Sequence, residues 1–165
     1  MTRLVLGMAL ALPISLLPAL ALADVASAQR QIEAQQLDAA EATLLDHLTR
    51  QPNDSEARFL LARVRAWRGQ PEQALPLYDQ LLQREPDNAD YLLGQGQALL
   101  WAGRPQAALE SLERAAQIAP DYADIQQVIQ QARAAMTSPV TATTAVATAP
   151  AQRRHELELS ARQDW

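Results

Sequence analysis

The apolar residues between about positions 24 and 136 form stripes of the kind that one face of an α-helix presents. Within a stripe they recur three and four positions apart, and the stripes are separated by Gly, Pro, Asn and Asp, which are typical of helix ends and turns. The segment Ile125 to Arg133 has one apolar stripe and an otherwise glutamine-rich surface, as the last helix of a stack requires. The pattern predicts seven helices, at about residues 25–34, 37–50, 54–67, 71–84, 88–101, 105–118 and 122–136.

The predicted helices follow a repeat with a period of 34 residues. Pro52, Pro86 and Pro120 lie 34 positions apart, and each opens a Pro-[Asn/Asp]-x-x-[Glu/Asp] segment. Aligning residues 67–75 with residues 101–109, at the same offset, gives five identities in nine positions. Such a period indicates an array of supersecondary units in which neighbouring repeats share a hydrophobic core.

Each repeated residue type has a structural role at a helix end or at a helix crossing. Proline ends the preceding helix, and the Asn or Asp directly after it is expected to cap the next one. Gly69 and Gly103 are expected to take the left-handed conformation that closes a helix, just before a proline in the first turn of the next helix. Ala74 and Ala108 fall where the two helices of a hairpin approach closely. The repeated unit is therefore a helical hairpin.

These residues resemble the tetratricopeptide repeat, whose consensus has small residues near the helix crossings, an alanine early in the second helix and a proline near its end. The resemblance implies an all-α fold, a tetratricopeptide-like hairpin solenoid of about seven helices. The first copy departs from the pattern, because residues 37–42 supply neither the glycine nor the proline of the turn. The predicted repeat domain spans 24–136, with repeats at about 24–54, 55–88 and 89–122 and a capping helix at 122–136.

Residues 1–23 have the composition of a signal peptide. A short basic start precedes an apolar run, and Ala21-Leu22-Ala23 fits a cleavage site, so Asp24 is the expected first residue of the mature protein. The alternative is a membrane-spanning anchor, which needs about 20 apolar residues and tolerates the two prolines of this run poorly. An exported chain without cysteine points to the periplasm of a Gram-negative bacterium.

The composition changes abruptly after residue 136. Residues 137–152 are rich in Ala, Thr and Pro and lack large apolar groups, which predicts a disordered linker. Residues 153–165 alternate polar and apolar positions with a period of two, which predicts one short β-strand.

The order of signal peptide, repeats, linker and alternating strand resembles the YaiO-type outer-membrane proteins. It also resembles, more distantly, the outer-membrane subunits that export exopolysaccharides. In those proteins periplasmic repeats precede a membrane barrel, so the resemblance implies that 153–165 is the first strand of a missing or truncated barrel. A barrel needs at least about eight strands, so the alternative is a strand that pairs with the sheet edge of another protein.

Composition and motifs disfavour several classes of function. The 14 basic residues, all arginine, face 19 acidic residues, and the resulting net charge of −5 argues against nucleic acid as a partner. The absence of cysteine excludes a disulfide framework and a thiolate metal site. His47 is predicted to lie on a helix surface, and Gly94 and Gly96 to be close-packing positions rather than a phosphate loop. We therefore expect no enzyme activity, catalytic residue, metal or cofactor.

Trp67 and Trp101 are the most informative side chains, because both lie in the last turn of a first helix, one repeat apart. They either staple adjacent hairpins or offer a stacking surface for sugar rings. Repeat proteins of this kind bind along a concave face. The residues predicted to line that groove are Glu56, Phe59, Arg63, Trp67, Asp90, Leu93, Gln97 and Trp101.

The preferred functional hypothesis is a non-catalytic periplasmic scaffold that binds protein partners of the cell envelope. The resemblance implies a place at an outer-membrane or exopolysaccharide-export assembly, with outer-membrane association through the C-terminal segment. One alternative is a polysaccharide-binding module that uses the groove tryptophans. Another is a general adaptor for envelope assembly, for example of enzymes or in cytochrome maturation.

Overall fold

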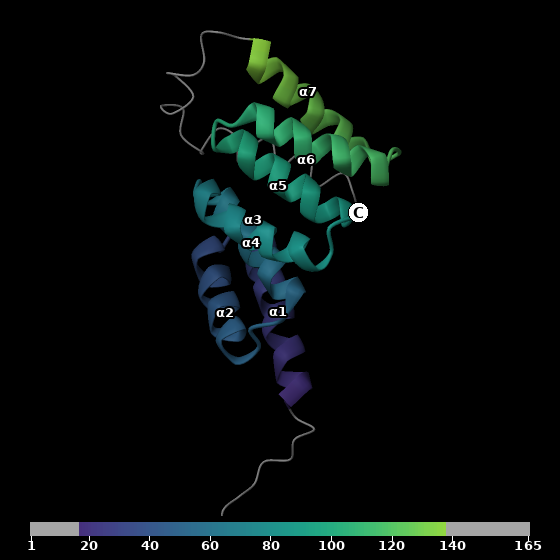
Figure 1. Cartoon of the computed structure of the whole chain (residues 1–165). Coiled ribbons are helices and arrows are strands. Elements are labelled where there is room, and N and C mark those ends of the chain that lie inside the picture. Colours follow the sequence, from purple (N-terminus) through teal and green to yellow (C-terminus); the bar gives the residue numbers. More distant parts are fainter. Residues whose placement is uncertain (1–16, 138–165) are drawn as a thin grey trace, which may run out of the picture.

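The computed structural model describes residues 17–137, which form seven α-helices in sequence order (Figure 1). The predicted number and type of elements are confirmed within this range. Six helices lie within about one residue of their predicted bounds, whereas the first begins at Leu17, inside the predicted signal peptide. The linker and the strand predicted beyond residue 137 lie outside the described residues. The helices are α1 (Leu17–Glu33), α2 (Leu37–Arg50), α3 (Ser55–Trp67), α4 (Pro71–Arg84), α5 (Ala89–Trp101), α6 (Pro105–Ile118) and α7 (Ala123–Thr137).

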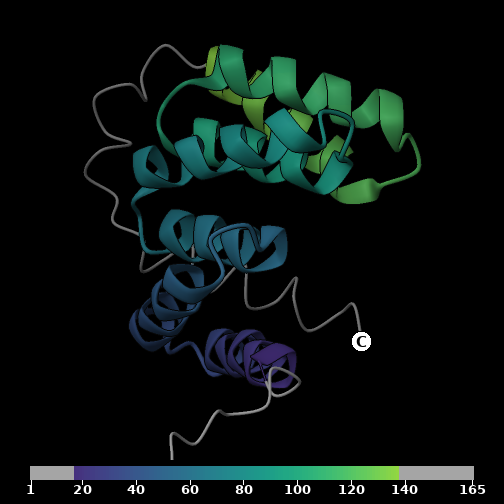
Figure 2. The same cartoon turned by 60° about the horizontal axis from the view of Figure 1, so that its bottom comes forward.

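The helices stack as hairpins in which each helix packs against the next one along the chain (Figures 1 and 2). The odd-numbered helices also contact one another in order, α1 with α3, α3 with α5 and α5 with α7. Within residues 17–137 no contact joins α2 to α4 or α4 to α6. The stack is therefore tighter along the odd-numbered helices than along the even-numbered ones. We therefore infer that the stack curves toward α1, α3, α5 and α7, and we call the face that these helices line the concave face.

The turns inside the hairpins follow the predicted geometry. Gly69 and Gly103 have φ values of 76° and 72°, the left-handed conformation that closes a helix. In the first repeat Gln35 takes the same place, 34 residues before Gly69, with φ at 59°. Its neighbours make the same backbone bonds, since Gln36 N–H donates to the Gln31 carbonyl at 2.8 Å as Arg104 N–H donates to the Leu99 carbonyl at 2.9 Å.

The turns between hairpins differ from the prediction by one residue. The side chain of Asp54 accepts from the Ala57 N–H at 3.0 Å, and that of Asn88 accepts from the Asp90 and Tyr91 N–H groups. The cap is therefore the second residue after proline, not the first. The residue directly after proline is used to complete the turn before the helix begins.

Small residues allow the close approach of the helices, as predicted. Ala74 and Ala108 are fully buried. A Cβ added at Gly94 would lie 2.6 Å from the Tyr78 ring, and one added at Gly96 would lie 2.6 Å from Leu112 Cγ. Both glycines are thus packing positions in α5, as the sequence predicts.

The prediction that His47 lies on a helix surface is wrong. Its side chain is only 1% exposed, and its Nε2 lies 2.8 Å from an Asp54 carboxylate oxygen. Its Nδ1 lies 3.8 Å from Asp24, whose carboxylate pairs with Arg50 at 2.7 Å. Burial opposes the charge of Asp54, but the Ala57 N–H and His47 outweigh it and lower the pKa of that carboxyl below its ordinary value. The partners of His47 come from two other segments, so no local pattern reveals them.

Candidate functional site

The predicted groove residues lie on two neighbouring helices of the concave face. Each helix contributes four of them at spacings of three, four and four residues, which places them on one side of an α-helix. Since α3 and α5 contact each other, the structure brings the two sets together. The α3 set is Glu56, Phe59, Arg63 and Trp67, and the α5 set is Asp90, Leu93, Gln97 and Trp101.

Arg63 is the centre of the α3 set. Its guanidinium carbon lies 4.5 Å from the centroid of the Trp67 ring and 5.6 Å from that of Phe59, within the range of cation–π attraction. The side chain is half-buried. Desolvation lowers the pKa of Arg63 from its ordinary value, against smaller opposing effects of Tyr78, Tyr122 and Asp90. A positive charge is thus held against aromatic faces in a partly dry environment.

Two arginines at the end of α3, one in its last turn and one directly after it, are arranged differently. Arg65 Nε lies 3.0 Å from the Glu41 carboxylate, and Arg68 pairs with both Asp38 and Glu41 of α2. They fasten α3 to the preceding hairpin. Among the described residues, neither an ion pair nor a hydrogen bond joins Arg63 to an acidic side chain.

An aromatic cluster surrounds this cation. Phe59 packs edge-on against Tyr78 at a centroid distance of 6.2 Å and lies 5.1 Å from the Tyr91 ring. Burial raises the pKa of Tyr78 and of Tyr91 above the ordinary value. Tyr122 is 38% exposed; its pKa is also raised, by burial and by the nearby acids Asp90 and Asp124. All of these phenols therefore stay neutral at physiological pH.

Two of the α5 residues contribute less to an open surface than the prediction supposes. Leu93 is only 8% exposed and packs in the core formed by α5, α6 and α7. Trp101 is half-buried against the core between the second and third repeats. Trp101 therefore fits the role of a staple between hairpins, which was one of the two interpretations of the tryptophans.

The structure extends the predicted set into two rows that sequence reasoning missed. Positions 34 residues apart carry acids on α3, α5 and α7 in one row, and glutamines interrupted by Arg63 on all four odd-numbered helices in the other. Reading the register across these helices would have found both rows. We call the first the acidic row and the second the amide row; Gln29 links them by donating to Glu56 at 3.1 Å. The acidic row is Glu56, Asp90 and Asp124, and the amide row is Gln29, Arg63, Gln97 and Gln131.

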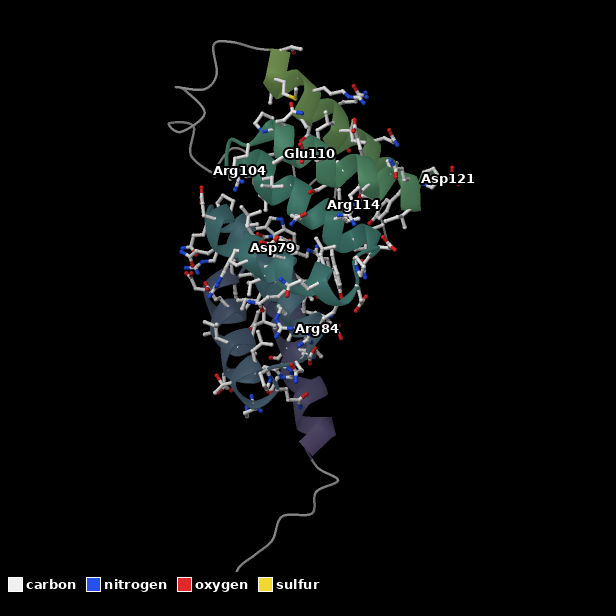
Figure 3. All side chains as sticks on the ribbon, viewed as in Figure 1. Asp79, Arg84, Arg104, Glu110, Arg114 and Asp121 are labelled. Atoms are coloured by element: carbon white, nitrogen blue, oxygen red, sulfur yellow. The ribbon has the colours of Figure 1, made fainter. Side chains whose placement is uncertain are left out.

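The opposite side of the stack carries exposed charges of both signs. Figure 3 labels six of them, on α4, on α6 and in the turns beside these helices. Arg84 donates to the Asn53 carbonyl at 3.0 Å, and Arg114 donates to the Pro86 carbonyl at 3.0 Å. These arginines brace the turns between hairpins, which is a structural role.

Two further features, a metal site and a membrane-spanning helix, are missing from residues 17–137. In that range no group of three His, Asp or Glu side chains is placed to hold a metal ion. None of the described helices is long and apolar enough to cross a membrane.

Fold and concave face together define a tetratricopeptide-type helical solenoid, a fold suited to protein–protein interaction and in general non-catalytic. Residues 68–123 match the family model described as tetratricopeptide repeat. No curated protein sequence matches the chain.

Solved structures agree with this fold. The chain is similar to the first tetratricopeptide domain of human RPAP3, with a TM-score of 0.67, 13% identity and coverage of 72% of this chain and 94% of that one. It is similar to a thermophilic tetratricopeptide protein of Thermus thermophilus, with a TM-score of 0.66, 21% identity and coverage of 70% and 66%. An O-GlcNAc transferase of Thermobaculum terrenum gives a TM-score of 0.66 at 24% identity, with coverage of 70% and 22%. The chain thus spans only about a fifth of that transferase, and at these identities the likeness concerns the fold alone.

Proposed function

We propose that this chain is a non-catalytic scaffold that binds a polypeptide partner across its concave face. The observation that carries the proposal is the set of Phe59, Arg63 and Trp67 on α3, in which a half-buried cation lies on aromatic rings. Aromatic residues and arginine are the side chains that dominate the energy of protein–protein interfaces. The rows of amides and acids around them supply polar groups for the rim of such an interface.

The proposed location is the periplasm, at an outer-membrane or exopolysaccharide-export assembly. Support comes from the composition of residues 1–23 and of the segment 137–165, and from the YaiO-type order of segments. The proposed partner is accordingly an envelope protein, and the C-terminal segment is the proposed point of outer-membrane association. A general adaptor for envelope assembly remains the alternative within the same class of function.

Direct polysaccharide binding is a second alternative, but the surroundings of the tryptophans favour a protein partner. The Arg63 guanidinium already covers part of the Trp67 ring, and Trp101 is half-buried against the core. Sugar rings need an uncovered aromatic face to stack on. Titration of exopolysaccharide fragments, followed by tryptophan fluorescence, checks this point: saturable quenching that is lost in Trp67→Leu would favour the sugar.

Site-specific photo-crosslinking in living cells tests the protein-binding proposal. A photoreactive amino acid replaces Gln97 on the concave face or, as a matched control, Gln80 on the outer side of α4. We expect a defined crosslinked envelope protein from position 97 and none from position 80. Equal products from both positions, or none from position 97 in a protein with unchanged circular dichroism, would contradict the proposal. Products from cytochrome-maturation components alone would favour the adaptor.

A further inference from the structure

Arg63 is held by aromatic rings rather than by an acid. The distances to Trp67 and Phe59 place both rings within cation–π range. The acids of α2 pair with Arg65 and Arg68, and Asp90 acts on Arg63 as a nearby charge without forming an ion pair. A guanidinium carries its N–H donors on its edge, and cation–π contact with a ring does not satisfy them as a carboxylate would. Among the described residues no acceptor satisfies that edge.

This arrangement has an energetic consequence. Desolvation is the largest influence on Arg63, and it works against the charge. A cation taken partly out of water without an anionic partner destabilises the folded state, and ring faces return only part of that loss. An anion that docks on the concave face would restore the missing interaction.

The neighbouring side chains restrict which anion fits. Along the amide row Arg63 is flanked by Gln29 and Gln97, so the row offers a single positive charge. The acidic row runs beside it, with Glu56 and Asp90 both exposed. These acids repel a doubly charged phosphate more strongly than a carboxylate. They also repel an acidic side chain of the partner that lies on this face away from Arg63.

We propose that Arg63 receives the side-chain carboxylate of an Asp or Glu in the partner polypeptide and thereby sets the register in which the partner lies across α3 and α5. This inference rests on the proposed function, because it names the chemistry of the partner at the same face. A guanidinium edge and a carboxylate form paired, charge-assisted hydrogen bonds, which are directional as well as strong. The rings of Phe59 and Trp67 beside the ion pair accommodate the apolar side chains next to the acid.

Peptide selection on the full chain tests the inference. A phage library of random 12-residue peptides is selected on the wild-type protein and on Arg63→Met, which keeps an unbranched stem but removes the charge. Arg104→Met is the matched control, since Arg104 is exposed at the start of α6, on the side shown in Figure 3. We expect peptides with a fixed Asp or Glu from the wild type and from Arg104→Met, and no acidic preference from Arg63→Met.

A binding cycle then measures the contact itself. One selected peptide is synthesised with Glu or with Gln at the fixed position, and its affinity is measured by fluorescence anisotropy. In the wild type the Gln peptide should bind about tenfold more weakly, the size of one charge-assisted hydrogen bond. In Arg63→Met the ratio should fall below about twofold, because the coupling is lost. The thermal midpoint of Arg63→Met should equal or exceed that of the wild type.

Each outcome decides a separate point. Equal binding of the two peptides by the wild type, or an acidic preference that survives in Arg63→Met, overturns the role of Arg63 but leaves protein binding intact. Failure to select any peptide contradicts the proposed function as well. If Arg63→Met does not fold, Arg63→Gln, which copies the residue found at position 97, takes its place.

Discussion

At the scale of single residues, Gln35 marks where the first repeat departs from the others. Its φ of 59° is a conformation that glycine adopts without cost and that a residue with a Cβ adopts at a cost of about 1–2 kcal/mol. The same hydrogen bonds close the helix in all three hairpins. The hairpin packing therefore sets the backbone conformation of the turn, whether the residue at this position is glutamine or glycine.

Replacing Gln35 by glycine should stabilise the protein. Relief of the left-handed strain outweighs the greater freedom of glycine in the unfolded chain, so we expect the free energy of unfolding to rise by about 0.5–1 kcal/mol. Urea unfolding followed by circular dichroism measures it. Gln36→Gly is the control, because Gln36 has a φ of −88° and should gain nothing. Equal effects of the two substitutions would refute the argument.

The Asp54 carboxylate should make stability depend on pH in the acidic range. Its pKa is lower in the folded protein than in the unfolded chain, so its contribution is complete above the unfolded pKa of about 4 and is lost as the pH falls through the folded pKa. Asparagine caps helices equally well but does not titrate. Asp54→Asn should therefore weaken the fall in the urea midpoint below about pH 4, whereas Asp87→Asn, at an exposed turn position, should leave it unchanged.

At the scale of helices, α5 depends on glycine for its fit. The Cβ positions of Gly94 and Gly96 are occupied by Tyr78 of α4 and Leu112 of α6, so α5 is packed tightly on both sides. The hydrophobic content of this helix alone does not show that requirement. It follows from the repeat register, which places both glycines inside a first helix.

Gly94→Ala should destabilise the protein through a clash rather than through backbone strain. Overpacking of this kind costs about 1–3 kcal/mol. Removing the obstructing ring in Tyr78→Leu should make the alanine less harmful, so the double variant should be more stable than the sum of the single effects predicts. Strict additivity in urea unfolding would show that the Tyr78 ring is not the obstacle.

The helices could be predicted from the sequence because their signals are local. Prolines, turn glycines and apolar stripes recur at a fixed spacing, and six helices were located to within about one residue. The burial of His47 could not be predicted, because it depends on Asp24 and Asp54, which only the fold brings together. Likewise, the positions of the groove residues followed from the register, whereas the burial of Leu93 follows from its packing against α6 and α7.

At the scale of the whole molecule, the repeats are joined in a line and need not be equally stable. Stability in such an array is a sum of repeat and interface contributions, so it can differ along the chain. The first hairpin contains the strained Gln35 and a buried histidine, while the third contains Gly103 at the corresponding turn.

The backbone amides of the first hairpin should therefore exchange with solvent faster than those of the third. We expect amides of α2 to exchange faster than those of α5 and α6 under native conditions, and Gln35→Gly to narrow the difference. Mass spectrometry of peptic fragments gives the rates. Slower exchange in α2 than in α6 would show that the polar cluster around His47 stabilises this end instead.

The predicted export signal determines which residue begins the mature protein in the cell. If residues 1–23 are removed as predicted, the intact mass of protein recovered from a periplasmic extract corresponds to a chain that begins at Asp24. Ala23→Leu should retain the longer form, because the cleavage site needs a small residue there. A wild-type mass that includes residues 1–23 would favour the membrane anchor.

The lack of contact between successive even-numbered helices has a mechanical consequence. Each hairpin packs on the next through its second helix against the following odd-numbered helix, and also through the odd-numbered helices themselves. A hairpin can therefore roll about this junction while successive even-numbered helices separate or approach. A segment that spans α3 and α5 would restrain this rolling at the second and third repeats. The occupant of the concave face would therefore govern the curvature of the array as well as occupy it.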